Sequence, residues 1–215
     1  MDYIIKTAAY LLDGAVVSLQ IFFVTLIGCV PLSLLLATVY KKNKVFAKIV
    51  SFYTWLFRGT PLMLQLFFFM YMLPSFGIGV NRMMVAFITF IMNYTAYFVE
   101  IIRAGIESVP KDQTESASVE GASQFYYFRK IVLPQAIRKE LPTITNEFIT
   151  LIKDTSLVTV IAISDLMRGV KEVVSRDFTL SPFVLAAIFY LAISYIIVSM
   201  MKKIERKWDF LDSLS

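Results

Sequence analysis

Long stretches of uncharged and mostly apolar residues dominate the chain. They cover residues 14–40, 59–81, 83–99 and 179–201, none of which contains Asp, Glu, Lys or Arg. An α-helix rises about 1.5 Å per residue, so roughly 20 apolar residues cross the hydrocarbon core of a membrane. Strands of a membrane barrel are shorter, about 10 residues, and alternate strictly between apolar and polar positions. The pattern therefore predicts an all-α protein that crosses a membrane several times.

We expect about five transmembrane helices within a single domain that covers residues 1–215. The expected spans are residues 14–40, 46–76, 82–103, 141–164 and 179–201. The second is too long for one straight crossing, and it contains Arg58-Gly59-Thr60-Pro61, where Gly and Pro allow a helix to break or tilt. Charged residues interrupt the fourth. Residues 1–14 carry two Asp around a short apolar stretch, and we expect an amphipathic helix on the membrane surface.

Lysines and arginines gather in three regions, residues 41–48, 103–139 and 202–207. With five spans, these regions share one side of the membrane if the N-terminus lies on the other side. Basic residues concentrate on the cytoplasmic side of membrane proteins. We therefore expect an outside N-terminus and a cytoplasmic C-terminus. The same bias explains the net charge of +5 without a nucleic-acid partner.

Composition and motifs argue against an enzyme. The chain contains no His and one Cys, Cys29, which excludes a disulfide framework and a thiol metal site. The phosphate-binding pattern G-x-x-x-x-G-K-[ST] is absent from the sequence, as are G-x-S-x-G, H-E-x-x-H and C-x-x-C. We expect no catalytic residue, no metal site and no cofactor in this chain, so any ATP must be bound by a partner.

The stretch ESASVEGASQFYYFRKIVLP, residues 115–134, lies between apolar segments on the predicted cytoplasmic side. Its pattern predicts a short helix, a turn at Gly121 and a second helix over residues 125–133 that Pro134 interrupts. From periodicity alone, an ordinary amphipathic loop on the membrane surface explains it as well.

The spacing within this stretch matches a known signature. Glu115, Ala117, Gly121, Ile131, Leu133 and Pro134 fit E-A-A-x3-G-x9-I-x-L-P, with Ser116 where the pattern usually has Ala. This resembles the signature loop in permease subunits of type I ABC importers. Further segments look like the polar amino acid uptake branch of that family, and together they cover most of residues 58–160: Arg58-Gly59-Thr60-Pro61, EIIRAGI at 100–106, LPQA at 133–136 and KDTSL at 153–157.

The resemblance implies a type I ABC importer permease fold with a cytoplasmic docking loop at about residues 107–134. In that family the loop forms a coupling helix that sits in a groove of a separate ATP-binding subunit, which binds ATP and Mg. The residues expected to dock are Glu115, Ser116, Ala117, Glu120, Gly121 and Ala122. The small residues among them permit close approach, and Glu115 supplies a charge for pairing.

The resemblance also implies further partners and a location. These are a second permease copy, identical or related, and an extracytoplasmic amino acid-binding protein that delivers the substrate. The expected location is the inner or plasma membrane of a prokaryote.

Two polar stripes run along expected spans. Thr143, Glu147, Thr150 and Asp154 share one face of the fourth span, and Asn93, Tyr97 and Glu100 share one face of the third. Charged groups at membrane depth are costly and usually functional. We expect the two stripes to face each other and line a water-filled path. The candidate substrate-binding residues are Glu147, Asn93, Tyr97, Thr143 and Glu100.

Glu147 is the main candidate for substrate binding, because no Lys or Arg lies close to it in sequence. A carboxylate there could bind the ammonium or guanidinium group of arginine or lysine. Alternatively, Glu147 pairs with a charge on another span, and selectivity rests with the external binding protein. Glu100 lies three residues before Arg103, so a structural ion pair is an alternative to its substrate role.

Two other classes of function remain open on sequence grounds. A secondary transporter or channel driven by an ion gradient would use the same intramembrane carboxylates, although it has no need of a docking loop. A membrane anchor or assembly factor would not need polar stripes in two spans.

Overall fold

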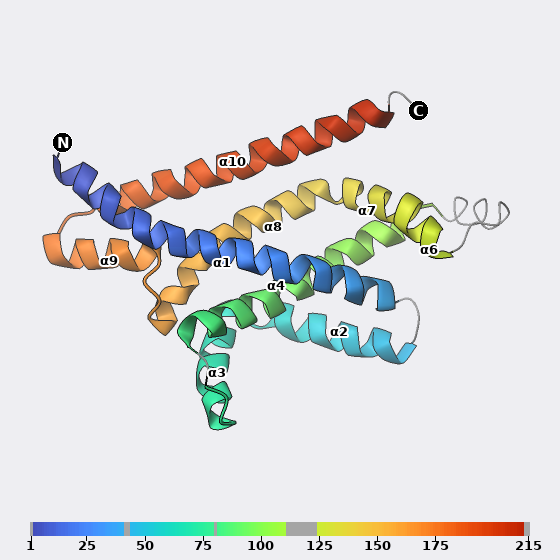
Figure 1. Cartoon of the computed structure of the whole chain (residues 1–215), viewed down its shortest axis with the longest axis horizontal. Coiled ribbons are helices and arrows are strands. Elements are labelled where there is room, and N and C mark those ends of the chain that lie inside the picture. The colour runs from blue at the N-terminus through green and yellow to red at the C-terminus, as the bar shows by residue number, and fades with distance from the viewer. Residues whose placement is uncertain (1, 41–43, 80, 111–123, 213–215) are drawn as a thin grey trace.

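The computed structural model describes residues 2–40, 44–79, 81–110 and 124–212, and within them every regular element is helical (Figure 1). The predicted docking residues Glu115 to Ala122 lie outside the described residues, so their role stays a prediction. The helices are α1 (Asp2–Tyr40), α2 (Lys44–Gly59), α3 (Leu62–Ser75), α4 (Arg82–Glu107), α6 (Gln124–Tyr127), α7 (Leu133–Lys139), α8 (Leu141–Asp154), α9 (Leu166–Asp177) and α10 (Ser181–Asp212).

Helix α1 is continuous, and the boundary expected near residue 14 is wrong. Gly14 does not end the helix, because apolar and helix-compatible residues continue on both sides of it. A Cβ atom at Gly14 would lie 2.7 Å from the backbone of Asp165, so Gly14 lets the start of α9 pack closely against α1. Tyr3 and Tyr10 donate hydrogen bonds of 2.7 Å to Asp177 and Glu172 of α9.

The predicted break in the second span is confirmed. Helix α2 ends at Gly59, α3 begins at Leu62, and the two axes are bent by 106°. Pro61 precedes α3 with an extended backbone (φ −61°, ψ 136°), which starts the new helix in a different direction.

Helix α4 is the central element, because it packs against α1, α2, α3 and α7. Asn81 caps its first turn by accepting a hydrogen bond of 2.8 Å from the Met84 amide. Its buried face joins α1, α3 and the segment after α8 in the main apolar core. Fully buried members of this core include Ile21, Leu66, Phe90, Leu151 and Ile152.

The expected fourth span, residues 141–164, is not one α-helix. Helix α8 ends at Asp154, and residues Thr155–Ile161 form a 3₁₀ helix that ends at Ala162 in the left-handed conformation (φ 59°). The polar stripe makes this segment less apolar than the other spans. Arg82 donates a hydrogen bond of 3.3 Å to the Ala162 carbonyl and ties this end to α4.

Pro134 does not interrupt the helix before it, contrary to the expectation from sequence. A π-helical turn, Phe128–Val132, joins α6 to α7, and Pro134 lies in the first turn of α7. A proline ring clashes with the carbonyl group four residues earlier in a regular α-helix, and the wider π turn relieves that clash.

Three helices are long and apolar enough to cross a membrane, at residues Asp2–Thr38, Arg82–Glu107 and Ser181–Trp208. The bent pair α2 and α3 brings the number to four if it counts as one span. The sequence-based number of five is therefore approximate, because it counts the shorter and more polar α8 with its 3₁₀ extension.

The two ends of the molecule differ (Figure 1). The N-terminus, α9 and the start of α10 gather at one end. The C-terminal end of α1, the start of α2, α6, α7 and the end of α10 gather at the other. The described parts of the three basic regions therefore lie towards the same end, as the Lys and Arg distribution predicts.

Candidate functional site

The break between α2 and α3 forms one wall of a polar cavity of about 490 Å³. Helix α4 and helix α8 form the other walls. The lining residues are Arg58, Gly59, Thr60, Pro61, Leu62, Asn93, Tyr94, Tyr97, Glu147, Thr150, Asp154 and Leu157. The cavity thus gathers one cationic side chain, two carboxyl groups and two tyrosines within the expected membrane-spanning region.

Two buried side-chain amides stabilise the break between α2 and α3 through hydrogen bonds. The carbonyl of Phe57 cannot receive the helical hydrogen bond from residue 61, because Pro61 has no N–H. Gln65 donates to this carbonyl at 2.9 Å, and Asn93 donates to it at 3.1 Å. Gln65 also donates to the Thr60 carbonyl at 3.1 Å and accepts from Asn93 at 3.0 Å. The network fixes the wall that carries Arg58.

Helix α8 supplies the acidic wall. Glu147, Thr150 and Asp154 line the cavity, as their common helix face predicts. Tyr94 of α4 donates a hydrogen bond of 2.8 Å to Asp154, which ties α4 to the end of α8. Thr143 belongs to the same stripe in sequence, but it is exposed and does not line the cavity.

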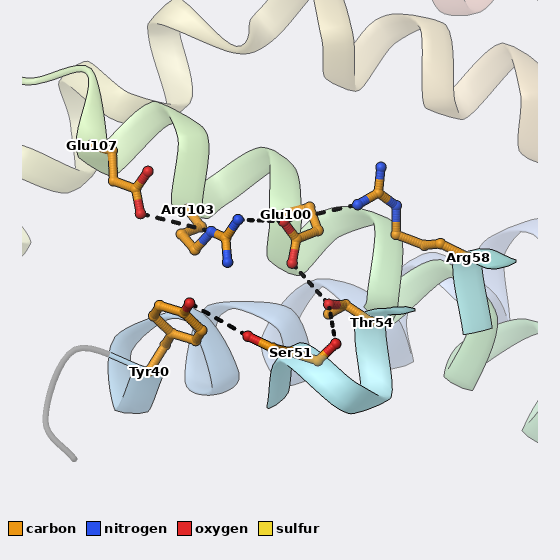
Figure 2. Close-up of polar contacts among 7 residues, drawn as sticks. All are labelled: Tyr40, Ser51, Thr54, Arg58, Glu100, Arg103 and Glu107. Carbon is orange, nitrogen blue, oxygen red and sulfur yellow. Dashed lines mark hydrogen bonds and ion pairs between the residues drawn. The ribbon is translucent and has the colours of Figure 1, made fainter. Parts of the chain in front are cut away.

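Glu100 lies in an ion-pair network beside the cavity and not in its lining (Figure 2). Its carboxylate contacts the Arg103 guanidinium at 2.7 Å, which confirms the predicted ion pair. The Thr54 hydroxyl donates to its other oxygen at 2.9 Å. Arg58 approaches the same carboxylate at 3.8 Å, beyond hydrogen-bond distance. Arg103 also lies 3.7 Å from Glu107.

The structure thus brings together three of the five predicted substrate residues, Asn93, Tyr97 and Glu147, and leaves Thr143 and Glu100 outside the cavity lining. The predicted substrate-binding set did not include Arg58 or Tyr94, which line the cavity, or Gln65, whose hydrogen bonds support its wall. Gln65 carried a usable signal, because it is a polar residue in the middle of the uncharged stretch 59–81.

A larger hollow of about 670 Å³ lies along α2 and α3, but its lining is almost wholly apolar. Leu56, Leu64, Phe68 and Met72 are among the residues that form it. Because no charged side chain lines it, we assign the functional site to the smaller polar cavity.

Comparison with known proteins decides the family. Residues 29–210 match the family described as binding-protein-dependent transport system inner membrane component. The chain belongs to this family. This family match, together with the amino acid transport relatives and the solved structure described next, confirms the resemblance to permease subunits of type I ABC importers in the polar amino acid uptake branch.

Relatives of this permease cover three quarters or more of its length. It is 35% identical to an arginine transport system permease protein, ArtQ of Bacillus subtilis, over 92% of each chain. It is 39% identical to the L-cystine transport system permease TcyB of Bacillus subtilis, over 75% of this chain and 70% of that one. It is 32% identical to a putative glutamine transport system permease, GlnP of Rickettsia bellii, over 96% and 97%.

Solved structures agree with the fold. The crystal structure of an amino acid ABC transporter with histidines superposes with a TM-score of 0.85 at 29% identity, covering 94% of this permease and 96% of that chain. An inward-facing MetNI methionine ABC transporter gives a TM-score of 0.70 at 15% identity, which shows a shared fold, with 96% of each chain covered.

Family membership settles the class of function. The permease is the membrane-spanning subunit of an inner-membrane ABC importer, and ATP hydrolysis belongs to a separate subunit. The permease is not itself catalytic. The alternatives of a secondary transporter, a channel or a simple anchor are excluded at this level.

Proposed function

We propose that this permease forms the translocation pathway for basic amino acids, namely arginine, lysine and histidine. The observation that carries the proposal is the placement of Glu147 and Asp154 in one cavity with Asn93 and Tyr97. Carboxylates are strong partners for guanidinium and ammonium groups, and charged groups at membrane depth usually serve transport. The Tyr97 ring attracts cations, as its contact with the Arg58 guanidinium shows.

The relatives favour an amino acid substrate without choosing among side chains, because their names refer to arginine, cystine and glutamine. The two carboxyl groups in the cavity favour a basic amino acid among these substrates. Asp154 already accepts a hydrogen bond from Tyr94, whereas Glu147 has no hydrogen bond or ion pair among those found within the described residues. Glu147 is therefore the proposed contact for the side-chain cation.

The proposed assembly follows the family. Two permease subunits form the path, and two ATP-binding subunits, which hold ATP and Mg, dock on the loop that contains Glu115 to Ala122. An extracytoplasmic binding protein delivers the amino acid at the N-terminal side, and the C-terminus lies in the cytoplasm. Closure of the ATPase dimer then moves the docking loop and the attached helices as a rigid body.

The test is ATP-dependent uptake of labelled arginine into proteoliposomes that contain the permease, its ATPase and its binding protein. Unlabelled lysine, glutamine and glutamate serve as competitors. We expect inhibition by lysine and not by glutamate. Uptake of glutamine without uptake of arginine would contradict the basic specificity and leave the importer assignment intact.

Replacement of the key carboxylate gives a sharper result. We expect Glu147→Gln to lower arginine uptake about 10- to 100-fold, because a charge-assisted contact is lost. The complex with the ATPase should still assemble. Glu205→Gln on the exposed face of α10 is the matched control and should transport normally. Normal arginine uptake by Glu147→Gln would refute the assigned role.

A further inference from the structure

Arg58 is the one cationic side chain among the described residues that line the cavity. It lies in the last turn of α2, directly before the break. Its guanidinium carbon lies 5.4 Å from the centre of the Tyr97 ring, which holds the side chain over the cavity by a cation–π contact. Its side chain is 45% exposed, so it remains accessible to a ligand.

The ion-pair network does not require Arg58. Figure 2 shows that Glu100 points between Arg58 and Arg103. The contact to Arg103 is 2.7 Å, and the Thr54 hydroxyl donates to the second oxygen at 2.9 Å. The contact to Arg58 is 3.8 Å, which is too long for a hydrogen bond. Glu100 is therefore paired without Arg58, and the Arg58 guanidinium makes only a loose ion pair.

Positive and negative side chains lie on different walls of the cavity. The cation lies at the break between α2 and α3, whereas Glu147 and Asp154 lie on α8. An amino acid substrate is itself a zwitterion, with a carboxylate near an ammonium group. Arginine side chains bind carboxylates with two parallel hydrogen bonds, which gives both affinity and orientation.

We propose that Arg58 binds the α-carboxylate of the transported amino acid, while the carboxylates of α8 bind its cationic groups. This proposal rests on the proposed function, because it takes the same cavity as the substrate site. It assigns a specificity that does not depend on the side chain. The permease would select α-amino acids with a free carboxylate and reject their amides.

The test measures equilibrium binding to the purified permease–ATPase complex, without the binding protein, by isothermal titration calorimetry. The ligand pairs are arginine with argininamide and glutamine with glutaminamide. Within each pair only the carboxyl group differs, because the acid carries a negatively charged carboxylate and the other ligand a neutral amide. Measurements at about pH 6 keep the α-amino groups protonated, because their pKa is normally about 7.7–8.0. The variants are Arg58→Gln, Arg58→Lys and Arg103→Gln.

We expect the wild-type complex to bind the acid about 10- to 100-fold more tightly than the amide. Arg58→Gln should weaken binding of the acid by this factor, change binding of the amide little, and bring the ratio of the two constants close to one. Arg58→Lys should restore part of the discrimination. Arg103→Gln should keep it, because Arg103 contacts Glu100 and does not line the cavity.

Three results would overturn the proposal. The first is equal weakening of acid and amide in Arg58→Gln, which indicates a structural role. The second is a wild-type complex that does not distinguish acid from amide. The third is no binding of either amino acid. Binding of glutamine but not of arginine would refute only the basic specificity, and the glutamine pair would then test Arg58.

Discussion

At the scale of single residues, the site depends on a carbonyl group that has no helical partner. Pro61 removes the N–H that would bond to the Phe57 carbonyl, and the side chains of Gln65 and Asn93 replace it. Gln65 is 7% exposed and Asn93 is 3% exposed. Buried polar groups of this kind are costly to leave unpaired. The sharp break that carries Arg58 is therefore stabilised by two amides from outside the break itself.

Removal of the Gln65 amide should expose this dependence. We expect Gln65→Leu to destabilise the complex by about 1–3 kcal/mol, because the Thr60 carbonyl loses a donor and Asn93 loses its acceptor. The measurement is the thermal midpoint of the purified complex. Gln20→Leu is the matched control, since Gln20 is exposed on α1. Equal midpoints for the two variants would contradict the role of the network.

At the scale of elements, close approach between helices depends on small residues. Gly105 of α4 faces α7, and a Cβ atom there would lie 2.7 Å from the Ala136 carbonyl oxygen and 2.9 Å from the Glu140 side chain. Ala136 is itself buried in the small core that joins α1, α4, α6 and α7. Helix α7 follows the predicted docking residues 115–122 in the chain, so this contact connects that part of the chain to the central helix.

We expect Gly105→Ala to force α7 away from α4, at a cost of about 1–3 kcal/mol for overpacking. The variant should show a lower thermal midpoint of unfolding. It should also take up fewer amino acid molecules per ATP hydrolysed. Gly79→Ala is the matched control, because a Cβ atom at Gly79 meets nothing within 4 Å. Unchanged stability and coupling in Gly105→Ala would show that the α4–α7 contact adapts without loss.

At the scale of the whole molecule, the two ends gather different helices (Figure 1). The ends of α1 and α10 and the start of α2 share the basic end of the molecule with α6 and α7 (Figure 1). The predicted docking residues 115–122 lie between α4 and α6 in sequence, and the end of α4 and the start of α6 both lie at this end. The polar cavity lies between the break, α4 and α8. Movement of the loop can therefore reach the cavity through α4 and α7–α8.

A bulky charged residue in the predicted docking loop should disrupt the contact between the permease and the ATPase subunit. We expect Gly121→Arg to abolish co-purification with the ATPase, or to leave ATP hydrolysis without transport, because the resemblance places Gly121 in the close contact. Gly79→Arg is the matched control, because Gly79 lies just before the first residue of α4, at the end away from the loop. This variant should co-purify with the ATPase normally. Normal coupling in Gly121→Arg would count decisively against the docking assignment.

The class of the molecule follows from the amino-acid sequence alone. Runs of uncharged residues are long enough only for membrane helices, and Gly59 with Pro61 marked the break in the second span. Periodicity also placed Glu147 and Asp154 on one face, since that geometry is local to a helix. The motif spacing identified the family, which the comparisons confirmed.

Which of these residues come into contact depends on how distant segments of the chain pack together. Thr143 shares a helix face with Glu147 but does not line the cavity. Glu100 shares a helix face with Asn93, but its carboxylate contacts Arg103 and Thr54 instead. The union of residues 2–40 in one helix and the 3₁₀ turn after Asp154 likewise depend on neighbouring helices. Local periodicity defines a face, whereas contacts between distant segments define what that face touches, and those contacts placed Arg58 opposite the acidic wall.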